Sequence, residues 1–164
     1  AGIFMISAAC ASFGVISTVG MKHHIELLAA LCGSLRFISA EIGTRLCPLP
    51  ELISELAGRG GAAGNFYERL AEKLDSIGEV DFSALWASSL ECLTSLSRDE
   101  LSAMRALGDV LGRYELNEQL ESIDICLDSL NRSMHGLQTQ YPERRRLVLG
   151  LSAAAGILVL IVLI

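Results

Sequence analysis

The residues that could carry out chemistry are few and lie far apart. The densest group of metal-ligating side chains is His23 and His24, close to Glu26. Neighbouring residues on a helix point about 100° apart, and no second cluster completes a metal site. We therefore expect these histidines, and the isolated His135, to be solvated groups without a metal.

A glycine-rich stretch, Gly58 to Gly64, precedes a predicted helix, which is how phosphate-binding loops begin. Such a loop also needs a preceding strand and a terminal Gly-Lys-Ser/Thr, and this stretch has neither. Cys92 and Cys126 lie in apolar helical surroundings, where thiols are usually inert. The acidic residues are scattered at the spacing of a solvated helix surface. We therefore predict no enzyme activity and no cofactor.

The composition excludes several classes of protein. With 164 residues, 51% hydrophobic and only 20% charged, the chain is about one domain long and too apolar to be disordered. A net charge of −6 argues against a nucleic-acid partner. The five cysteines are odd in number and widely spaced, which predicts reduced thiols rather than a disulfide framework.

Both ends of the chain lack charged side chains. Residues 2–21 are mostly apolar and would form roughly 30 Å of helix, about the thickness of a bilayer core. Residues 147–164 would form roughly 27 Å. We predict transmembrane helices over 1–21 and 147–164. A cleaved signal peptide is the alternative for the first segment, but it lacks a basic region in front.

Basic residues flank both apolar segments on their inner side. Lys22 follows the first segment, and Arg144, Arg145 and Arg146 precede the second. By the positive-inside rule, residues 22–146 lie in the cytoplasm. Membrane lipid is thus a predicted partner of the two ends.

The middle region, 22–146, shows helical periods throughout and predicts an all-α bundle of about six helices. Asn65 and Asp81 are expected N-caps, and Ser97 with Glu100 has the spacing of a capping box. Pro142 predicts a break or kink. The expected helices run from Ile25 to Ile42, Pro50 to Leu56, Asn65 to Ile77, Asp81 through Phe82, Trp86 and Leu93, Ser97 to Gly112, and Leu116 to Leu137.

The last of these helices carries a sustained apolar stripe. Its members step by four and three residues: Leu116, Leu120, Ile123, Leu127, Leu130, Met134 and Leu137. This pattern suits either a dimerising coiled coil or the spine of an intramolecular bundle. The bundle is favoured because the other amphipathic helices need partners.

Three groups of residues resemble motifs of the stage III sporulation protein AB family, in the same order. They are Glu41-Ile42 with Pro48-Leu49-Pro50-Glu51-Leu52, then Leu85-Trp86-Ala87-Ser88-Ser89-Leu90, then Leu107-Gly108 with Leu111-Gly112, Glu115 and Gln119. Some positions depart from the family pattern: Thr44, Arg45 and Cys47 stand where the family usually has Tyr, Gly and Thr, and Glu115 stands for Asp.

The resemblance implies a non-enzymatic platform in the channel that links mother cell and forespore, on the mother-cell side of the outer forespore membrane. Family members are similar to the F-type platform proteins of type II secretion and type IV pilus machines. The implied partners are a cytoplasmic hexameric secretion-type ATPase, similar to stage III sporulation protein AA, and other membrane components of the channel. Alternatives are a secretion or pilus platform, a membrane-tethered homo-oligomeric adaptor, and a membrane-tethered enzyme.

The candidate docking residues come from these motifs. Pro48 and Pro50 predict a rigid turn between two helices. Gly112 is a plausible helix terminus, and Glu115 and Gln119 are expected to hold the start of the next helix, to face a partner, or to do both. The full candidate set is Glu41, Pro48, Leu49, Pro50, Trp86, Leu111, Gly112, Glu115 and Gln119.

Overall fold

The protein is described here by a computed structural model. The backbone is described for residues 2–45, 47–74, 81–113 and 115–163, and the side chains for the part of these ranges between 20 and 139. Among the described residues, no helix offers a stretch sufficiently long and apolar to cross a membrane. The predicted spans 1–21 and 147–164 fall outside the described side chains, apart from Gly20 and Met21.

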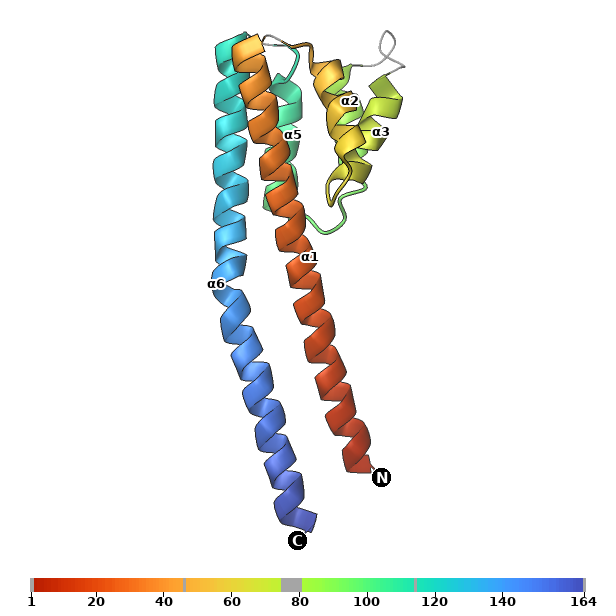
Figure 1. Cartoon of the computed structure of the whole chain (residues 1–164), viewed down its shortest axis with the longest axis vertical. Helices are drawn as coiled ribbons and strands as arrows, with labels where there is room; N and C mark the ends of the chain where they lie inside the picture. The colour runs from red at the N-terminus through yellow and green to blue at the C-terminus, as the bar shows by residue number, and fades with distance from the viewer. Residues whose placement is uncertain (1, 46, 75–80, 114, 164) are drawn as a thin grey trace. The chain divides into compact units, whose positions relative to one another are not determined.

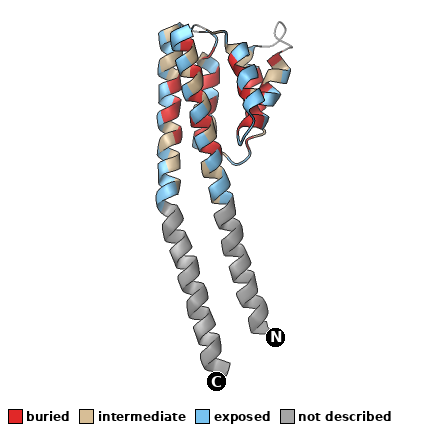
Figure 2. Cartoon of the chain, viewed as in Figure 1, coloured by how far each residue is buried: buried red, intermediate tan, exposed pale blue. Residues whose placement is uncertain are grey.

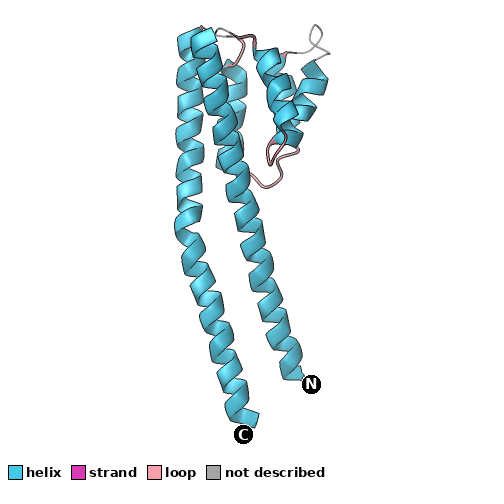
Figure 3. Ribbon diagram, viewed as in Figure 1, coloured by secondary structure: helices cyan, strands magenta, loops and turns pink. Residues whose placement is uncertain are grey.

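Six helices make up the described chain, and no strand occurs in these ranges (Figures 1 and 3). The predicted all-α class is therefore confirmed. The helices are α1 (Gly2–Arg45), α2 (Leu49–Arg59), α3 (Gly64–Leu74), α4 (Phe82–Leu90), α5 (Arg98–Val110) and α6 (Leu116–Leu163).

The chain divides into two compact units. One consists of Glu26–Met134, and the other of Ala1–Ile25 with His135–Ile164. The first unit contains α2 to α5 together with the adjoining halves of α1 and α6. The second contains the outer halves of α1 and α6. The predicted domain limits, 22 and 146, stay predictions.

The core of the Glu26–Met134 unit is built from the apolar faces that the sequence periods predict (Figure 2). On α1 the buried positions recur at steps of three and four residues, because such positions share one face of a helix. The same holds at the centre of the α6 stripe. The buried residues on these two helices are Leu27, Leu28, Leu31, Cys32, Leu35, Ile38 and Ile42 on α1, and Ile123, Cys126, Leu127 and Leu130 on α6.

The central part of the α6 stripe is thus covered by the same chain, as the bundle prediction requires. Ile123 and Leu130 are fully buried within a single copy. Near the start of α6, Leu120 lies against Gly43 of α1, where an added Cβ would be 3.8 Å from the leucine methyls. The two long helices therefore pack directly on each other in this unit.

The ends of the bundle helices differ from the prediction in three places. The terminal segments are not separate helices, because α1 and α6 run on through them without interruption. The α6 helix continues through Pro142, so the break predicted at this residue is wrong. A proline removes one backbone donor, but it leaves the other hydrogen bonds of a long helix in place. The α2 helix also extends to Arg59, so the glycine-rich loop is shorter than predicted.

Of the two predicted N-caps, Asp81 is confirmed and Asn65 is wrong. The α3 helix begins at Gly64, so Asn65 lies inside its first turn, and the carbonyl of Ala63 accepts the bonds from Phe66 and Tyr67. Asp81 is the N-cap of α4, but its side chain makes no capping bond. Phe82, Trp86 and Leu93 are the residues expected on the buried side of α4. Trp86 is buried as expected, whereas Phe82 is half-buried and Leu93 is buried but lies beyond the end of the helix. The predicted helix end at Ile77 falls outside the described residues.

The capping box at the start of α5 is confirmed. The Ser97 hydroxyl accepts from the Glu100 amide, at 3.3 Å, and the Glu100 carboxylate accepts from the Ser97 amide, at 2.7 Å. The other carboxylate oxygen of Glu100 accepts from the Ser133 hydroxyl of α6, at 2.6 Å. Glu100 is 2% exposed, so a local capping motif also joins two helices in the core.

Candidate functional site

Two chain reversals of the Glu26–Met134 unit meet through Leu49 and Gly112. Leu49 is the first residue of α2, and Gly112 follows the end of α5. A Cβ on Gly112 would lie 3.9 Å from a Leu49 methyl group. Gly112 has φ +81°, a conformation that favours glycine, so this position allows α5 to end and the chain to turn into α6.

Gln119 holds that turn from the first part of α6. Its side-chain oxygen accepts a hydrogen bond from the Gly112 amide, at 3.4 Å. Glu115 precedes α6, and its carbonyl accepts from the Gln119 amide, at 3.1 Å. Of the two roles predicted for Gln119, the structure thus shows the one of holding the start of the helix. The Glu115 side chain is exposed.

The proline pair shapes the first reversal. Pro48 is the N-cap of α2 with extended φ and ψ, and its carbonyl accepts from the amides of Glu51 and Leu52. Pro50 sits in the first turn of the helix, where its missing amide hydrogen costs nothing. Both prolines are exposed. Glu41, one turn before the end of α1, forms an ion pair with Arg45, at 3.4 Å.

Two of the candidate residues are buried. Trp86 is fully buried, and its indole N–H donates to the Met104 carbonyl, at 2.7 Å. Its ring meets Phe66 edge to face, with centroids 5.0 Å apart. Leu111 is also fully buried. In this conformation neither side chain is available to a partner, and Trp86 holds α4 and α5 together.

Carboxylates surround Cys47 at the α1–α2 reversal. Partial burial, a hydrogen bond to Glu51 and the charges of Glu51, Glu41 and Glu55 all raise the pKa of the Cys47 thiol. Burial is the largest cause of this shift, and the neighbouring carboxylates add to it because nearby anions disfavour a thiolate. Arg45 of this reversal is already paired with Glu41. This end of the bundle is therefore acidic.

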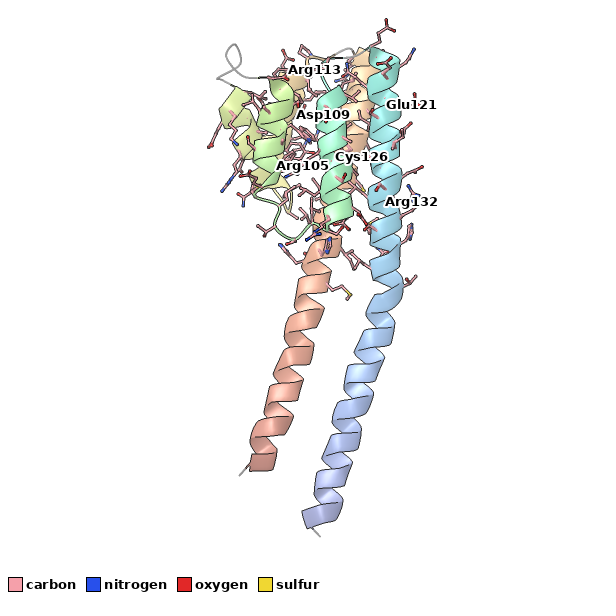
Figure 4. All side chains as sticks on the ribbon, turned by 180° about the vertical axis from the view of Figure 1, so that it is seen from behind. Arg105, Asp109, Arg113, Glu121, Cys126 and Arg132 are labelled. Carbon is pink, nitrogen blue, oxygen red and sulfur yellow. The ribbon has the colours of Figure 1, made fainter. Side chains whose placement is uncertain are left out.

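Sequence reasoning missed the polar links between α4 and the end of α5. Arg113 forms an ion pair with Asp81, and the Ser83 hydroxyl donates to Asp109, at 2.7 Å. Figure 4 shows Asp109 and Arg113 at the same end of α5. No local signal predicts these pairs, because their members are 26 or more residues apart. The α4–α5 pair is thereby tied at its outer end, beside the Gly112 turn.

The candidate residues thus fall into two groups. Glu41, Pro48, Leu49 and Pro50 form the first reversal, and Gly112, Glu115 and Gln119 form the second, with Leu49 joining them. Trp86 and Leu111 lie in the core. Within the residues that the structure describes, no group of three or more His, Cys, Asp or Glu could hold a metal ion.

The motifs that meet at these reversals are those of one family. Its sequence profile, described as stage III sporulation protein AB, matches residues 1–164. The chain belongs to the stage III sporulation protein AB family. The resemblance of the sequence to this family is therefore confirmed, and the chain is a sporulation protein.

A solved structure supports the same assignment at the level of the fold. A chain described as stage III sporulation protein AB superimposes with a TM-score of 0.63 at 22% sequence identity. The match covers 71% of this chain and 97% of the other. A search of curated proteins found no significant match. The family's helical fold is thus shared, although most residues differ.

Proposed function

We propose that this member of the stage III sporulation protein AB family is a non-enzymatic membrane platform of the mother cell–forespore channel. In this proposal residues 1–21 and 147–164 anchor it in the mother-cell side of the outer forespore membrane, and residues 22–146 face the cytoplasm. Its partner is a cytoplasmic hexameric ATPase, bound at the α1–α2 and α5–α6 reversals. Family membership and the charge flanks Lys22 and Arg144–Arg146 support this placement.

The observation that carries the docking proposal is the meeting of the two reversals. Family motifs far apart in the sequence come together through Leu49 and Gly112. Around this contact Pro48, Pro50 and Glu115 are exposed. A core role would bury such residues, whereas a rigid exposed turn suits recognition by another protein.

The charge of this surface suggests the chemistry of the partner. Glu41, Glu51 and Glu55 create a negative potential at Cys47, and Glu115 and Glu118 are exposed at the start of α6. The basic side chains nearby, Arg45 and Arg113, are paired with carboxylates. A partner with a basic face is therefore favoured, and its binding weakens as salt concentration rises.

Binding of the purified full-length chain to the ATPase from the same organism tests the proposal. The Glu115→Lys variant should weaken binding about tenfold, whereas Glu68→Lys, an exposed charge reversal on α3, should leave it unchanged. Helical content by circular dichroism confirms that both variants fold. Absence of saturable binding, or equal effects of the two variants, would contradict docking at these reversals.

A further inference from the structure

A pocket opens on one side of the Glu26–Met134 unit, between α1, α2 and the turn that leads into α3. Its volume is about 190 Å³. A cavity of about 150 Å³ with apolar walls holds a benzene-sized molecule, so this pocket has room for one branched apolar side chain. Its lining residues are Ala30, Gly33, Ser34, Leu56, Arg59, Gly60, Ala63 and Tyr67.

The pocket exists because the positions that could fill it carry little or no side chain. A Cβ placed on Gly33 of α1 would meet no atom within 4 Å, and the same is true of Gly60. Ala30 and Ala63 contribute only methyl groups. Leu56 and the ring of Tyr67, both buried, provide apolar wall, although the Tyr67 hydroxyl is a buried polar group. The site is therefore a small recess with partly apolar walls, to which Ser34, Arg59 and Tyr67 also bring polar groups.

One basic residue, Arg59, lines this recess, and a second, Arg36, lies nearby on α1. The Arg59 guanidinium lies 4.0 Å from the centre of the Phe37 ring and pairs with Glu55, at 2.7 Å. Both members of this pair are about half exposed, and such pairs exchange partners at little cost. Arg36 is exposed one turn after Gly33 on α1. An apolar group flanked by carboxylates would complement this recess and its two arginines.

Such a group is present on α6. Ile125 is 62% exposed, and it is the one large apolar side chain that stands exposed among the described residues. Glu121 and Asp128 lie one turn before and after it on the same face of the helix, and both are exposed. Figure 4 places Glu121 on the outer side of α6 and Cys126 on the side toward α5. Ile125 therefore projects away from the core between two carboxylates.

We propose that Ile125 of one copy of this chain inserts into the α1–α2–α3 pocket of a second copy. Glu121 and Asp128 then meet the basic rim formed by Arg36 and Arg59. The contact joins two different surfaces, so it is heterologous and repeats from copy to copy. Copies joined in this way form a closed ring or an open filament. This inference goes beyond ATPase docking and requires no ATPase.

The contact is small, so its strength depends on local concentration. One apolar side chain and two exposed ion pairs give a weak association in solution. Copies confined together gain a high effective concentration, which converts weak contacts into stable assembly. Cross-linking of the full-length chain in intact cells is therefore the appropriate test, because it preserves that confinement.

The test uses Ala62→Cys, at the pocket turn, and Ser122→Cys, one turn before Ile125. A double variant treated with a short thiol cross-linker should give a ladder of dimers, trimers and larger species. Neither single variant should do so, and co-expressed single variants should stop at dimers. The parent chain sets the background from Cys47 and Cys92. Absence of a ladder, or dimers from Ser122→Cys alone, would overturn the heterologous contact.

Pocket and side chain are tested separately in the same double variant. Ile125→Ser, which removes the inserted group, and Gly33→Leu, which fills the pocket, should each reduce the ladder at least tenfold. Ala29→Leu, exposed on α1 outside the pocket, is the matched control and should leave it unchanged. A ladder that survives Gly33→Leu would refute the pocket as the site. Because none of these measurements involves ATPase, their failure is distinct from failure of the docking proposal.

Discussion

Replacement of Gly108 by alanine should destabilise the bundle strongly, because Trp86 leaves no room for a methyl group. A Cβ at this position would lie 2.2 Å from Cδ1 and 2.6 Å from Cγ of the Trp86 ring. The ring cannot move aside freely, since it is fully buried, donates to the Met104 carbonyl and packs edge to face on Phe66.

The size of the effect follows from three contributions. Overpacking of a filled core costs about 1–3 kcal/mol. Loss of the buried indole hydrogen bond costs about 1–3 kcal/mol more. Alanine within α5 returns about 0.5–1 kcal/mol through its higher helix propensity. We expect Gly108→Ala to lower the free energy of unfolding by about 1–5 kcal/mol, and Tm by about 4–20 °C.

Chemical denaturation of the purified full-length chain measures this change. Trp86 is the one tryptophan of the chain, so its fluorescence reports on the very ring that must move. Gly33→Ala is the control, because its Cβ meets nothing within 4 Å and should stabilise by about 0.5–1 kcal/mol. An unchanged emission spectrum with unfolding within about 0.5 kcal/mol of the parent would refute the reasoning.

Two further predictions concern buried polar groups. Glu100→Ala should cost about 1–3 kcal/mol in thermal denaturation, because it removes half of the capping box and the carboxylate that accepts from the half-buried Ser133 hydroxyl; a loss below about 0.5 kcal/mol would contradict the assigned role. Burial raises the pKa of Cys126 to about 12, from 9.0 in the unfolded chain. Its protonated thiol therefore contributes stability below pH 9 that is lost as pH rises from about 9 toward 12. Denaturation at pH 8 and pH 10.5 should show a smaller pH dependence in Cys126→Ala than in the parent, and an identical dependence would exclude this thiol as a source.

Much of the local structure could be predicted because its causes are local. The α5 capping box depends on two residues three apart, and Ser97 and Glu100 form it as predicted. The apolar steps on α1 and α6 follow from the helical repeat, whatever the partner helix. The predicted helix limits that were wrong lie where the local sequence has only a weak structural preference. Pro142 sits inside a helix, and α3 begins at Gly64 rather than after Asn65.

The candidate site could be predicted only as separate motifs. The sequence places Pro48, Leu49 and Pro50 in one turn, and Gly112 with Gln119 near another. Only the path of α2 to α5 brings Leu49 to Gly112, more than 60 residues apart. The hydrogen bond from the Gly112 amide to Gln119 could not be predicted either, because it exists only once α5 has ended in its left-handed turn.

By itself, the sequence determined that this protein is helical, where most helices lie, and to which family it belongs. These properties follow from residue periods, caps and ordered motifs, all of which are written in short stretches of chain. The tertiary structure decided that Trp86 lies over Gly108, that Glu100 reaches Ser133, and that Ile125 stands exposed while a pocket stays open on α1. Each of these depends on how helices distant in sequence cross, because contact between their side chains is set by the packing of the whole core.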